Sequence, residues 1–380
     1  MAENSTAKCG TSSRKRRRPN PLTVPTGILW ERDPHTAAKH TLLRRYVSAW
    51  FPIMASQFRD TGITFFDGFA GPGEYTNARD SSPAIAMEQA LRSDVTCYGT
   101  QTRLVFIEDH RGRAAHLENL LDDRFPLGIR PPGLVTSVRR GKCGDLFAQE
   151  IADVGGWDGP VFANLDGWGA DTDYKIVQRI AQQQSSEVLV TFEDQFFIRF
   201  ANGEQQAGER VFGHSDWRNV DQLPTADKKP FLVDRYREGL HLAGFLYVLT
   251  FEMIDEGGHS LHLFFGTTNK VAVRKFKDGL WEVDGVSGQR FRDPRDPNQM
   301  SFDILHPDFT PLESRILRLL DGRDHSMAEL CEDALLETIY RETDVKPAVD
   351  RLVDQRKVDQ VSTGRSYADR VFRLAAPQLF

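Results

Sequence analysis

The sequence predicts a doubly wound α/β domain whose last strand is antiparallel, followed by a small C-terminal winged-helix domain. Short apolar runs alternate with segments in which apolar residues recur every three or four positions, as in buried parallel strands joined by helices. Two later apolar runs are separated by only a short glycine-bearing connection, which favours a β-hairpin. From Pro307 onward, three helical segments precede a second hairpin, which is the winged-helix order.

The composition is that of a globular protein with room for two cores. The chain has 380 residues, of which 40% are hydrophobic and 27% charged. It lacks an apolar run of membrane-spanning length, and its charged N-terminus is not followed by the apolar stretch of an export signal, so we expect a soluble, cytoplasmic protein. The four cysteines are scattered and the ten histidines form no ligand pattern, so we expect no disulfide and no metal.

Charge is distributed unevenly. The formal net charge is −6, yet six basic residues against one acid lie in the first twenty positions, which leaves the remainder near −11. An acidic body discourages non-specific nucleic-acid binding outside local patches. We expect residues 1–27 to form a disordered basic tail, either a solvated tail or a nucleic-acid-binding arm, residues 28–306 the α/β domain and residues 307–380 the winged helix.

The elements of the α/β domain follow from their apolar patterns. A helical stripe over 35–58 contains Pro52, which can kink or divide it, and further stripes lie at 84–91, 113–121 and 174–181. Strand-like runs occupy 63–66, 104–107, 159–165, 188–192, 245–254 and 260–267. Residues 195–240 and 280–306 are polar and poorly periodic, so we expect insertions or a linker there.

The C-terminal unit begins with three helices. Thr310, Ser326 and Thr343 are suitable N-caps for helices that reach Leu320, Glu337 and Lys357. Strands at 358–361 and 370–374 then form the hairpin.

The first motif that carries chemistry is a strand that ends in an acid and enters a glycine loop, D-x-F-x-G-x-G, formed by Asp67, Phe69, Gly71 and Gly73. A nicotinamide fingerprint fails here because Thr76 stands at its last position. This form occurs instead in methyltransferases, in which Asp67 would meet the methionine end of the cofactor and the glycines would make room for it. The alternative is a glycine-rich turn with no ligand.

Two further acids follow later strands. Glu108 ends an apolar strand, and its carboxylate can accept both ribose hydroxyls of a nucleoside; the alternative is a solvated strand end. Asp145 follows the run 134–138 and could bond an adenine amino group, although it is equally suited to cap the helix after it.

The fourth motif is Asp166-Gly167-Trp168-Gly169, which again follows an apolar strand. A carboxylate can hold an amino group by accepting its protons, and an aromatic ring can stack on a flat base. Asp166 and Trp168 are therefore the candidates for catalysis on an exocyclic amine, although the chain lacks the prolines of the D-P-P-Y form.

Together these motifs resemble the three-Cys-motif partner family, TcmP, over about residues 30–374. The resemblance also rests on His35-Thr36 and Lys39, on Ser82-Pro83 and on the Phe264 to Asn269 run. The family usually has Asp-Pro-aromatic-Gly where this chain has Asp166-Gly167-Trp168-Gly169. It implies a class I methyltransferase fold, S-adenosylmethionine as cofactor, a C-terminal winged helix and a partner, the three-Cys-motif protein, which resembles radical S-adenosylmethionine enzymes.

Three functional interpretations stay open at this point. The first is an S-adenosylmethionine-dependent methyltransferase acting on nucleic acid, and the second is an adaptor that keeps the fold and holds the partner protein. The third is a methyltransferase for a small molecule or a protein.

The winged helix could contact DNA or RNA, or it could be a protein-docking module. Its net charge is −3, with fourteen acids and eleven Lys plus Arg, so a nucleic-acid face would be local. The candidate phosphate contacts lie on the third helix and the wing tip: Lys346, Arg351, Arg356, Lys357 and Arg365.

Overall fold

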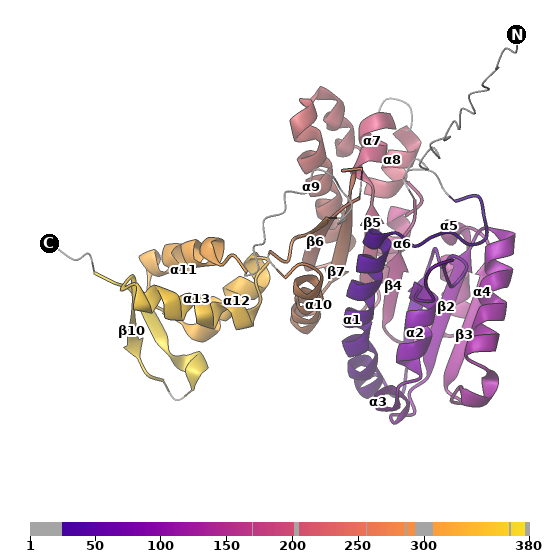
Figure 1. Cartoon of the computed structure of the whole chain (residues 1–380), viewed down its shortest axis with the longest axis horizontal. Helices are drawn as coiled ribbons and strands as arrows, with labels where there is room; N and C mark the ends of the chain where they lie inside the picture. The colour runs from indigo at the N-terminus through magenta and orange to yellow at the C-terminus, as the bar shows by residue number, and fades with distance from the viewer. Residues whose placement is uncertain are drawn as a thin grey trace, which may run out of the picture.

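The computed structural model describes residues 25–168, 170–200, 205–255, 257–285, 287–292, 307–364 and 366–376. Its larger unit is built on one eight-stranded sheet with the order β3-β2-β1-β4-β5-β7-β6-β8 (Figure 1). The strands are β1 Ile63–Asp67, β2 Thr102–Glu108, β3 Leu134–Arg140, β4 Val161–Leu165, β5 Glu187–Phe192, β6 Tyr247–Ile254, β7 Ser260–Thr267 and β8 Arg290–Arg292.

The strand directions confirm the predicted fold class. The five strands from β3 to β5 are mutually parallel, and β7 is antiparallel to both of its neighbours, β5 and β6. β8, which pairs with β6 in parallel, lies in a segment that we expected to be an insertion or linker. The sheet is therefore a doubly wound, Rossmann-like methyltransferase sheet in which β7, the last of the long strands, is antiparallel.

Helices cover both faces because the buried strands carry apolar side chains on both sides. Phe65 belongs to one core cluster and its neighbour Phe66 to the other, as the alternation of a strand requires. The first cluster is covered by α1 Pro34–Gln57, α2 Ser82–Ala90, α3 Ser93–Thr96, α4 Arg111–Arg124 and α10 Lys270–Val283. The second is covered by α5 Cys143–Asp153, α6 Tyr174–Ala181, α7 Asp194–Phe200, α8 Gln205–Phe212 and α9 Thr225–Ala243.

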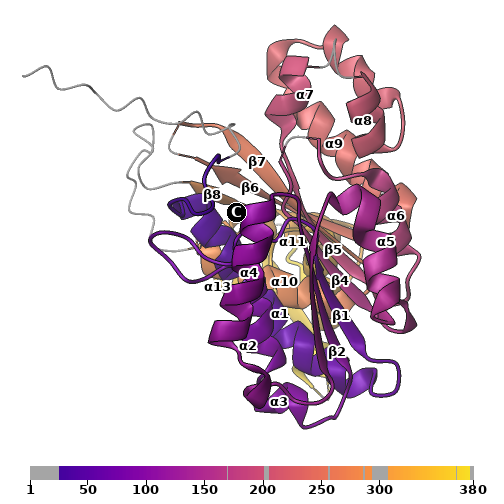
Figure 2. The ribbon, with the colours of Figure 1, turned by 90° about the vertical axis from the view of Figure 1, so that its right-hand side faces the viewer.

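Two expectations for the α/β unit are wrong in detail. Pro52 does not divide the first helix, because α1 continues from Pro34 to Gln57. Residues 195–240 are largely helical rather than irregular: α7, α8 and α9 project beyond the sheet in Figure 2. Several of the apolar residues in this segment are large aromatics: Phe197, Phe212 and Trp217 pack on each other.

The C-terminal unit has three helices and a three-stranded sheet of order β10-β11-β9. Its elements are α11 Thr310–Gly322, β9 His325–Ser326, α12 Met327–Glu337, α13 Glu342–Asp354, β10 Val358–Ser362 and β11 Val371–Leu374. Single 3-10 turns occur at Leu127–Ile129, Gly156–Asp158, Asp216–Gln222 and Tyr367–Asp369.

Only one of the three predicted caps is confirmed. Ser326 forms a capping box with Glu329 at the start of α12. Thr310 is instead the first residue of α11, and Arg341, not Thr343, caps α13. α13 also ends at Asp354 rather than at Lys357, because Arg356 takes a positive φ of 56°.

The two units share a packed boundary at α10. Trp281 belongs to the apolar cluster of the C-terminal unit, and its indole Nε1 donates to Ile339 O at 3.1 Å. Arg274 forms an ion pair with Glu342 across the same boundary. Across the described ranges, none of the helices combines the length and apolar character needed to cross a bilayer.

Candidate active site at the carboxyl edge of the sheet

Three of the predicted acids lie at one edge of the sheet. Asp67 ends β1, Glu108 ends β2 and Asp166 directly follows β4. β1 lies between β2 and β4 in the sheet, and Asp67 is in register with Phe106 and Asn164. The carboxyl edge is where open α/β sheets bind their ligands.

Asp67 is fully buried and holds the turn that leaves β1. One carboxyl oxygen accepts from Phe69 N at 3.1 Å and the other from Asn164 Nδ2 at 3.2 Å. Burial raises the pKa of Asp67 to about 6. Both carboxyl oxygens of Asp67 are thus engaged in hydrogen bonds within the protein. Asp67 therefore shapes the loop beside a ligand site rather than offering a free carboxylate to the ligand.

Glu108 fixes the glycine loop against β2. Its Oε2 accepts from Gly71 N at 2.9 Å and its Oε1 accepts from His110 N at 2.8 Å. Gly71 has a φ of +64°, a conformation that side chains rarely adopt. The carboxylate therefore lies between the two loops that follow β1 and β2, and its remaining lone pairs are suited to hydroxyl donors.

Gly73 differs from its predicted role. A Cβ at this position would lie 2.8 Å from Leu117 Cδ1 and 2.7 Å from Leu120 Cδ2. The glycine allows the loop to pack closely on α4, rather than leaving open space for a ligand.

Asp166 is held by two residues that come from different elements. Lys39 Nζ of α1 lies 2.7 Å from both carboxyl oxygens, and Thr191 Oγ1 of β5 donates to Oδ1 at 2.5 Å. Although burial opposes ionisation, the charge and hydrogen bonds of Lys39 hold the pKa of Asp166 below its ordinary value. Asp166 is thus an oriented anion rather than a strong base.

Lys39 is a site residue that the sequence motifs did not predict. It is one of the residues on which the family resemblance rests, but no role was predicted for it. The signal was present: Lys39 lies three and four positions before Leu42 and Leu43, so it shares the apolar face of α1. A cation on an apolar stripe needs a buried anion, and its side chain is only 13% exposed here.

Neutral groups surround this pair. His40 is buried, and burial lowers its pKa to about 4, so it is uncharged at neutral pH. Its ring centroid lies 5.7 Å from that of Tyr75, whose pKa burial raises. His35 lies at the start of the same helix, 3.0 Å from Asp33, and burial lowers its pKa as well.

Phe69 explains why the loop after β4 carries glycine. A Cβ at Gly167 would lie only 2.8 Å from Phe69 Cζ, so the ring packs directly on the glycine backbone. Trp168, the next residue, is 37% exposed, so its ring is accessible to a substrate. Asp145 is exposed in the first turn of α5, and Lys142, not Asp145, is the N-cap. The structure shows no contact that joins Asp145 to the other acids.

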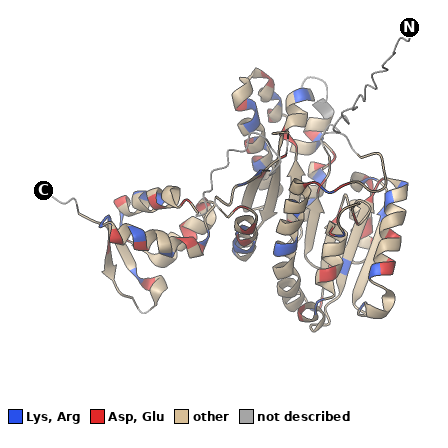
Figure 3. Ribbon diagram, viewed as in Figure 1, with Lys and Arg blue, Asp and Glu red and all other residues tan. Residues whose placement is uncertain are grey.

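Two of the predicted nucleic-acid residues are paired with acids of the C-terminal unit. Lys346 pairs with Asp350, and Arg351 pairs with Glu313, so both charges on α13 are compensated within the unit. Figure 3 shows basic and acidic positions interspersed along the ribbon of the C-terminal unit. Arg365 lies outside the described residues.

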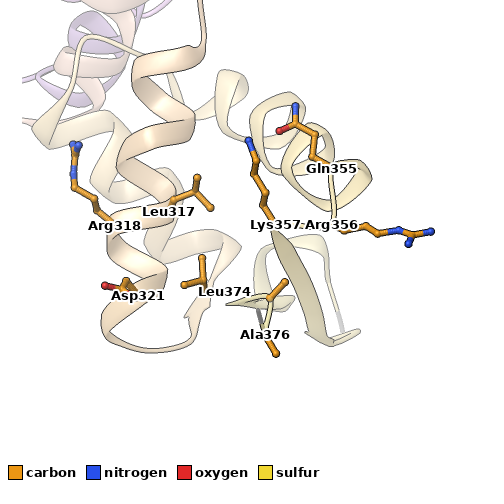
Figure 4. A pocket seen from close by; sticks show the side chains of 9 residues that line it. Leu317, Arg318, Asp321, Gln355, Arg356, Lys357, Leu374 and Ala376 are labelled. Carbon is orange, nitrogen blue, oxygen red and sulfur yellow. The ribbon is translucent and has the colours of Figure 1, made fainter. Parts of the chain in front are cut away.

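Arg356 and Lys357 are exposed, but they follow α13 rather than lie on it. They line a hollow of about 610 Å³ with Leu317 and Arg318 of α11 and with Leu374 (Figure 4). Figure 4 shows Arg318, Arg356 and Lys357 at separate positions around this hollow.

Comparisons with known proteins give distant likenesses only. No family model matches the chain, and no curated protein matches it. Among solved structures, Trm1 from Pyrococcus horikoshii, in complex with S-adenosyl-L-methionine, is 11% identical, with 94% of this chain and 95% of that chain covered and a TM-score of 0.36. The O-methyltransferase TomG from Streptomyces achromogenes, in complex with the same compound, is 15% identical over 63% of this chain and 92% of that chain, with a TM-score of 0.30.

A third likeness is to EvdMO1, 11% identical over 64% of this chain, with a TM-score of 0.32; this chain covers only 42% of EvdMO1. At such TM-scores the likenesses add nothing to what the strand order itself shows. That order, with an antiparallel strand inserted between β5 and β6, defines a class I methyltransferase fold.

Proposed function

We propose that this protein is an S-adenosylmethionine-dependent methyltransferase. The observation that supports the proposal best is the arrangement at the carboxyl edge. Glu108, at the end of β2, is hydrogen-bonded to the glycine loop. The Lys39–Asp166 pair lies at the end of β4, on the other side of β1 and Asp67. Both the charges and the order of these groups along the edge suit the two ends of that cofactor.

The residues present fit the cofactor chemically. A ribose offers two hydroxyl donors, and the Glu108 carboxylate has lone pairs left beyond its two backbone bonds. The amino-acid end carries a carboxylate, which is complementary to the Lys39 ammonium. The buried His40 Nδ1 lies beside that pair and has no hydrogen-bond partner among the described residues, which leaves a polar atom available to a ligand.

When bound, S-adenosylmethionine supplies an electrophilic methyl group. Asp166 would stay ionised at neutral pH because Lys39 holds its pKa low, so it can accept hydrogen bonds from the protons of an amine and orient the nitrogen. Thr191 and Lys39 prevent the carboxylate from rotating. Trp168, exposed beside it, would position a planar substrate by stacking.

We further propose a nucleic-acid substrate and a winged-helix assignment for the C-terminal unit. The order helix, strand, two helices and hairpin supports the assignment. The exposed Arg356 and Lys357 support phosphate contact, whereas the compensated Lys346 and Arg351 do not. The three-Cys-motif protein as partner is supported by the motif resemblance alone.

Calorimetric titration with S-adenosylmethionine tests the proposal. We expect saturable binding to the wild type and at least about a tenfold weaker Kd for Glu108→Gln, because a charged acceptor is replaced by a weaker one. Glu118→Gln is the matched control, since Glu118 is exposed on α4, and its affinity should equal that of the wild type.

Absence of binding at millimolar cofactor would overturn the enzymatic proposal and favour the adaptor interpretation. If binding is found, transfer of a labelled methyl group to RNA and DNA should be abolished in Asp166→Ala. Transfer that survives this substitution would remove Asp166 from catalysis.

A further inference from the structure

A short segment before α1 lies across the carboxyl edge. We call residues 25–33 the strap. In Figure 1 it is the indigo stretch that runs along the upper edge of the sheet, from the top of α4 to the top of α1. One of its ends therefore lies beside the loop after Glu108, and the other leads into the helix that carries Lys39.

Arg113 anchors the first end of the strap. This arginine is only 7% exposed, and its guanidinium donates to Gly27 O at 3.2 Å through Nε and at 3.1 Å through Nη2, and also to Pro25 O. A buried arginine whose donors are used on main-chain carbonyls holds that main chain firmly. Arg113 lies in the first turn of α4, five residues after Glu108.

In the middle of the strap, the Trp30 side chain packs over the glycine loop. Its Cη2 lies 3.7 Å from where a Cβ of Gly71 would be, and Gly71 is the residue that donates to Glu108. The indole packs edge-on against Tyr75 at 5.6 Å between centroids, and the Arg113 guanidinium covers it at 4.8 Å. Thr76 N donates to Trp30 O at 2.9 Å.

The far end is tied to the same loop and to α1. Arg32 and Asn77 exchange two hydrogen bonds, of 2.9 and 3.1 Å, and the Asp33 side chain caps α1 by accepting from Thr36 N at 2.7 Å. Glu108, which accepts from the covered Gly71, is only 8% exposed. A nucleoside therefore has little access to this carboxylate in the present arrangement.

We propose that the strap is the gate of the cofactor site, with Trp30 as its cover and Arg113 as its latch; this inference rests on the proposed function. The strap opens to admit the nucleoside end of the ligand and closes over it. Closure removes water from the carboxylate, where hydrogen bonds to a charged acceptor gain strength. Strap movement then governs the rates of entry and release.

A reversible disulfide across the strap tests the gate. A Cβ built at Gly112 lies 3.3 Å from Cγ1 of Ile28, and Gly112 has an ordinary backbone conformation, so Ile28→Cys combined with Gly112→Cys can bridge the strap to α4. Cys9→Ser and Cys97→Ser provide the background. We expect oxidation to slow association of S-adenosylmethionine at least tenfold, and reductant to restore it. Oxidation after loading should slow release by a similar factor.

Trp30→Ala provides a second test that does not depend on forming the bridge. Release of S-adenosylmethionine should become at least fivefold faster in this variant. Trp157→Ala is the matched control, because Trp157 is also covered by an arginine, Arg179 at 4.0 Å, but precedes β4 at the opposite edge of the sheet. Its release rate should be that of the wild type.

The outcomes separate the two proposals. If the wild type does not bind S-adenosylmethionine, the proposed function fails. If the wild type binds S-adenosylmethionine but neither the bridge nor Trp30→Ala changes the rates of association and release, the gate proposal is wrong and the strap is a fixed part of the structure.

Discussion

At the residue scale, Gly167 and Phe69 form a pair that sequence comparison alone does not reveal. The Phe69 ring takes the space that a side chain at Gly167 would fill. The glycine at this position therefore has a local steric cause. It gives no indication that the acid beside it has lost its role, since Asp166 remains held by Lys39 and Thr191.

We expect Gly167→Ala to destabilise the protein by about 1 kcal/mol, because the new methyl group displaces the edge of a ring that can still move. In the Phe69→Ala background the same substitution should cost much less. Urea unfolding of the four proteins measures this coupling. Equal costs in both backgrounds would show that the ring is not the obstacle.

The sequence predicts the acids of the candidate site but not the residues that hold them. Asp67, Glu108 and Asp166 each follow an apolar run, and such runs are visible in the sequence. Lys39 and Thr191 are not signalled in that way, because they reach Asp166 from 127 and 25 residues away. Gly73 was predictable as a glycine with a special role, but its actual neighbours, Leu117 and Leu120, belong to α4.

At the scale of elements, α10 connects the two units through one lysine. Lys277 is fully buried, and its Nζ lies within hydrogen-bond distance of four carbonyl oxygens, which share its protons: Ala334 O at 3.0 Å, Leu335 O at 2.6 Å, Thr338 O at 2.6 Å and Tyr340 O at 2.9 Å. These carbonyls belong to the last turn of α12 and the residues after it, where intrahelical donors run out. The ammonium thus caps the C-terminus of a helix that is more than fifty residues distant.

Lys277→Met should therefore lower the free energy of unfolding by about 3 kcal/mol, because carbonyls at the end of α12 lose their hydrogen-bond donor inside the protein. Lys275→Met on the same helix is the control, since its side chain is only half-buried and outside this contact. Thermal unfolding of both variants checks the prediction. Similar melting temperatures for the two would contradict it.

The same scale shows why some elements were mispredicted. Thr310 and Thr343 satisfy the sequence preference for a cap, yet Thr310 is the first residue of α11 and Arg341 is the N-cap of α13. Arg341 and Asp344 form a capping box in which the arginine side chain takes part. Local preference for a cap is worth about 1 kcal/mol, so packing and ion pairs can overrule it.

At the scale of the whole molecule, buried carboxyls link stability to pH. Glu187, at the start of β5, is 1% exposed and accepts from the hydroxyls of Tyr46 and Thr267. Burial raises its pKa to about 7, whereas an unfolded glutamate has a pKa of about 4.3. Between these values the folded state binds a proton that the unfolded state releases. The contribution to stability is fully present below the lower value and is lost as pH rises through the higher one.

Relative to Glu187→Gln, the wild type should thus lose up to about 3 kcal/mol of stability between pH 4.5 and pH 7.5. Denaturant unfolding at several pH values in this interval gives the difference directly. A difference that stays constant with pH, or that grows in favour of the wild type, would refute the assignment.

The sequence by itself determined the alternation of strands and helices, the hairpin that makes one strand of the sheet antiparallel, and the acids at the strand ends. These features depend on local apolar periodicity and on a single residue that follows a run. The tertiary structure decided which residues hold those acids, why Gly167 is required, and that the strap covers the glycine loop. It also decided that the cations on α13 are compensated within the unit. Each of these is a contact between segments far apart in the chain, and no local pattern encodes the partner of such a contact.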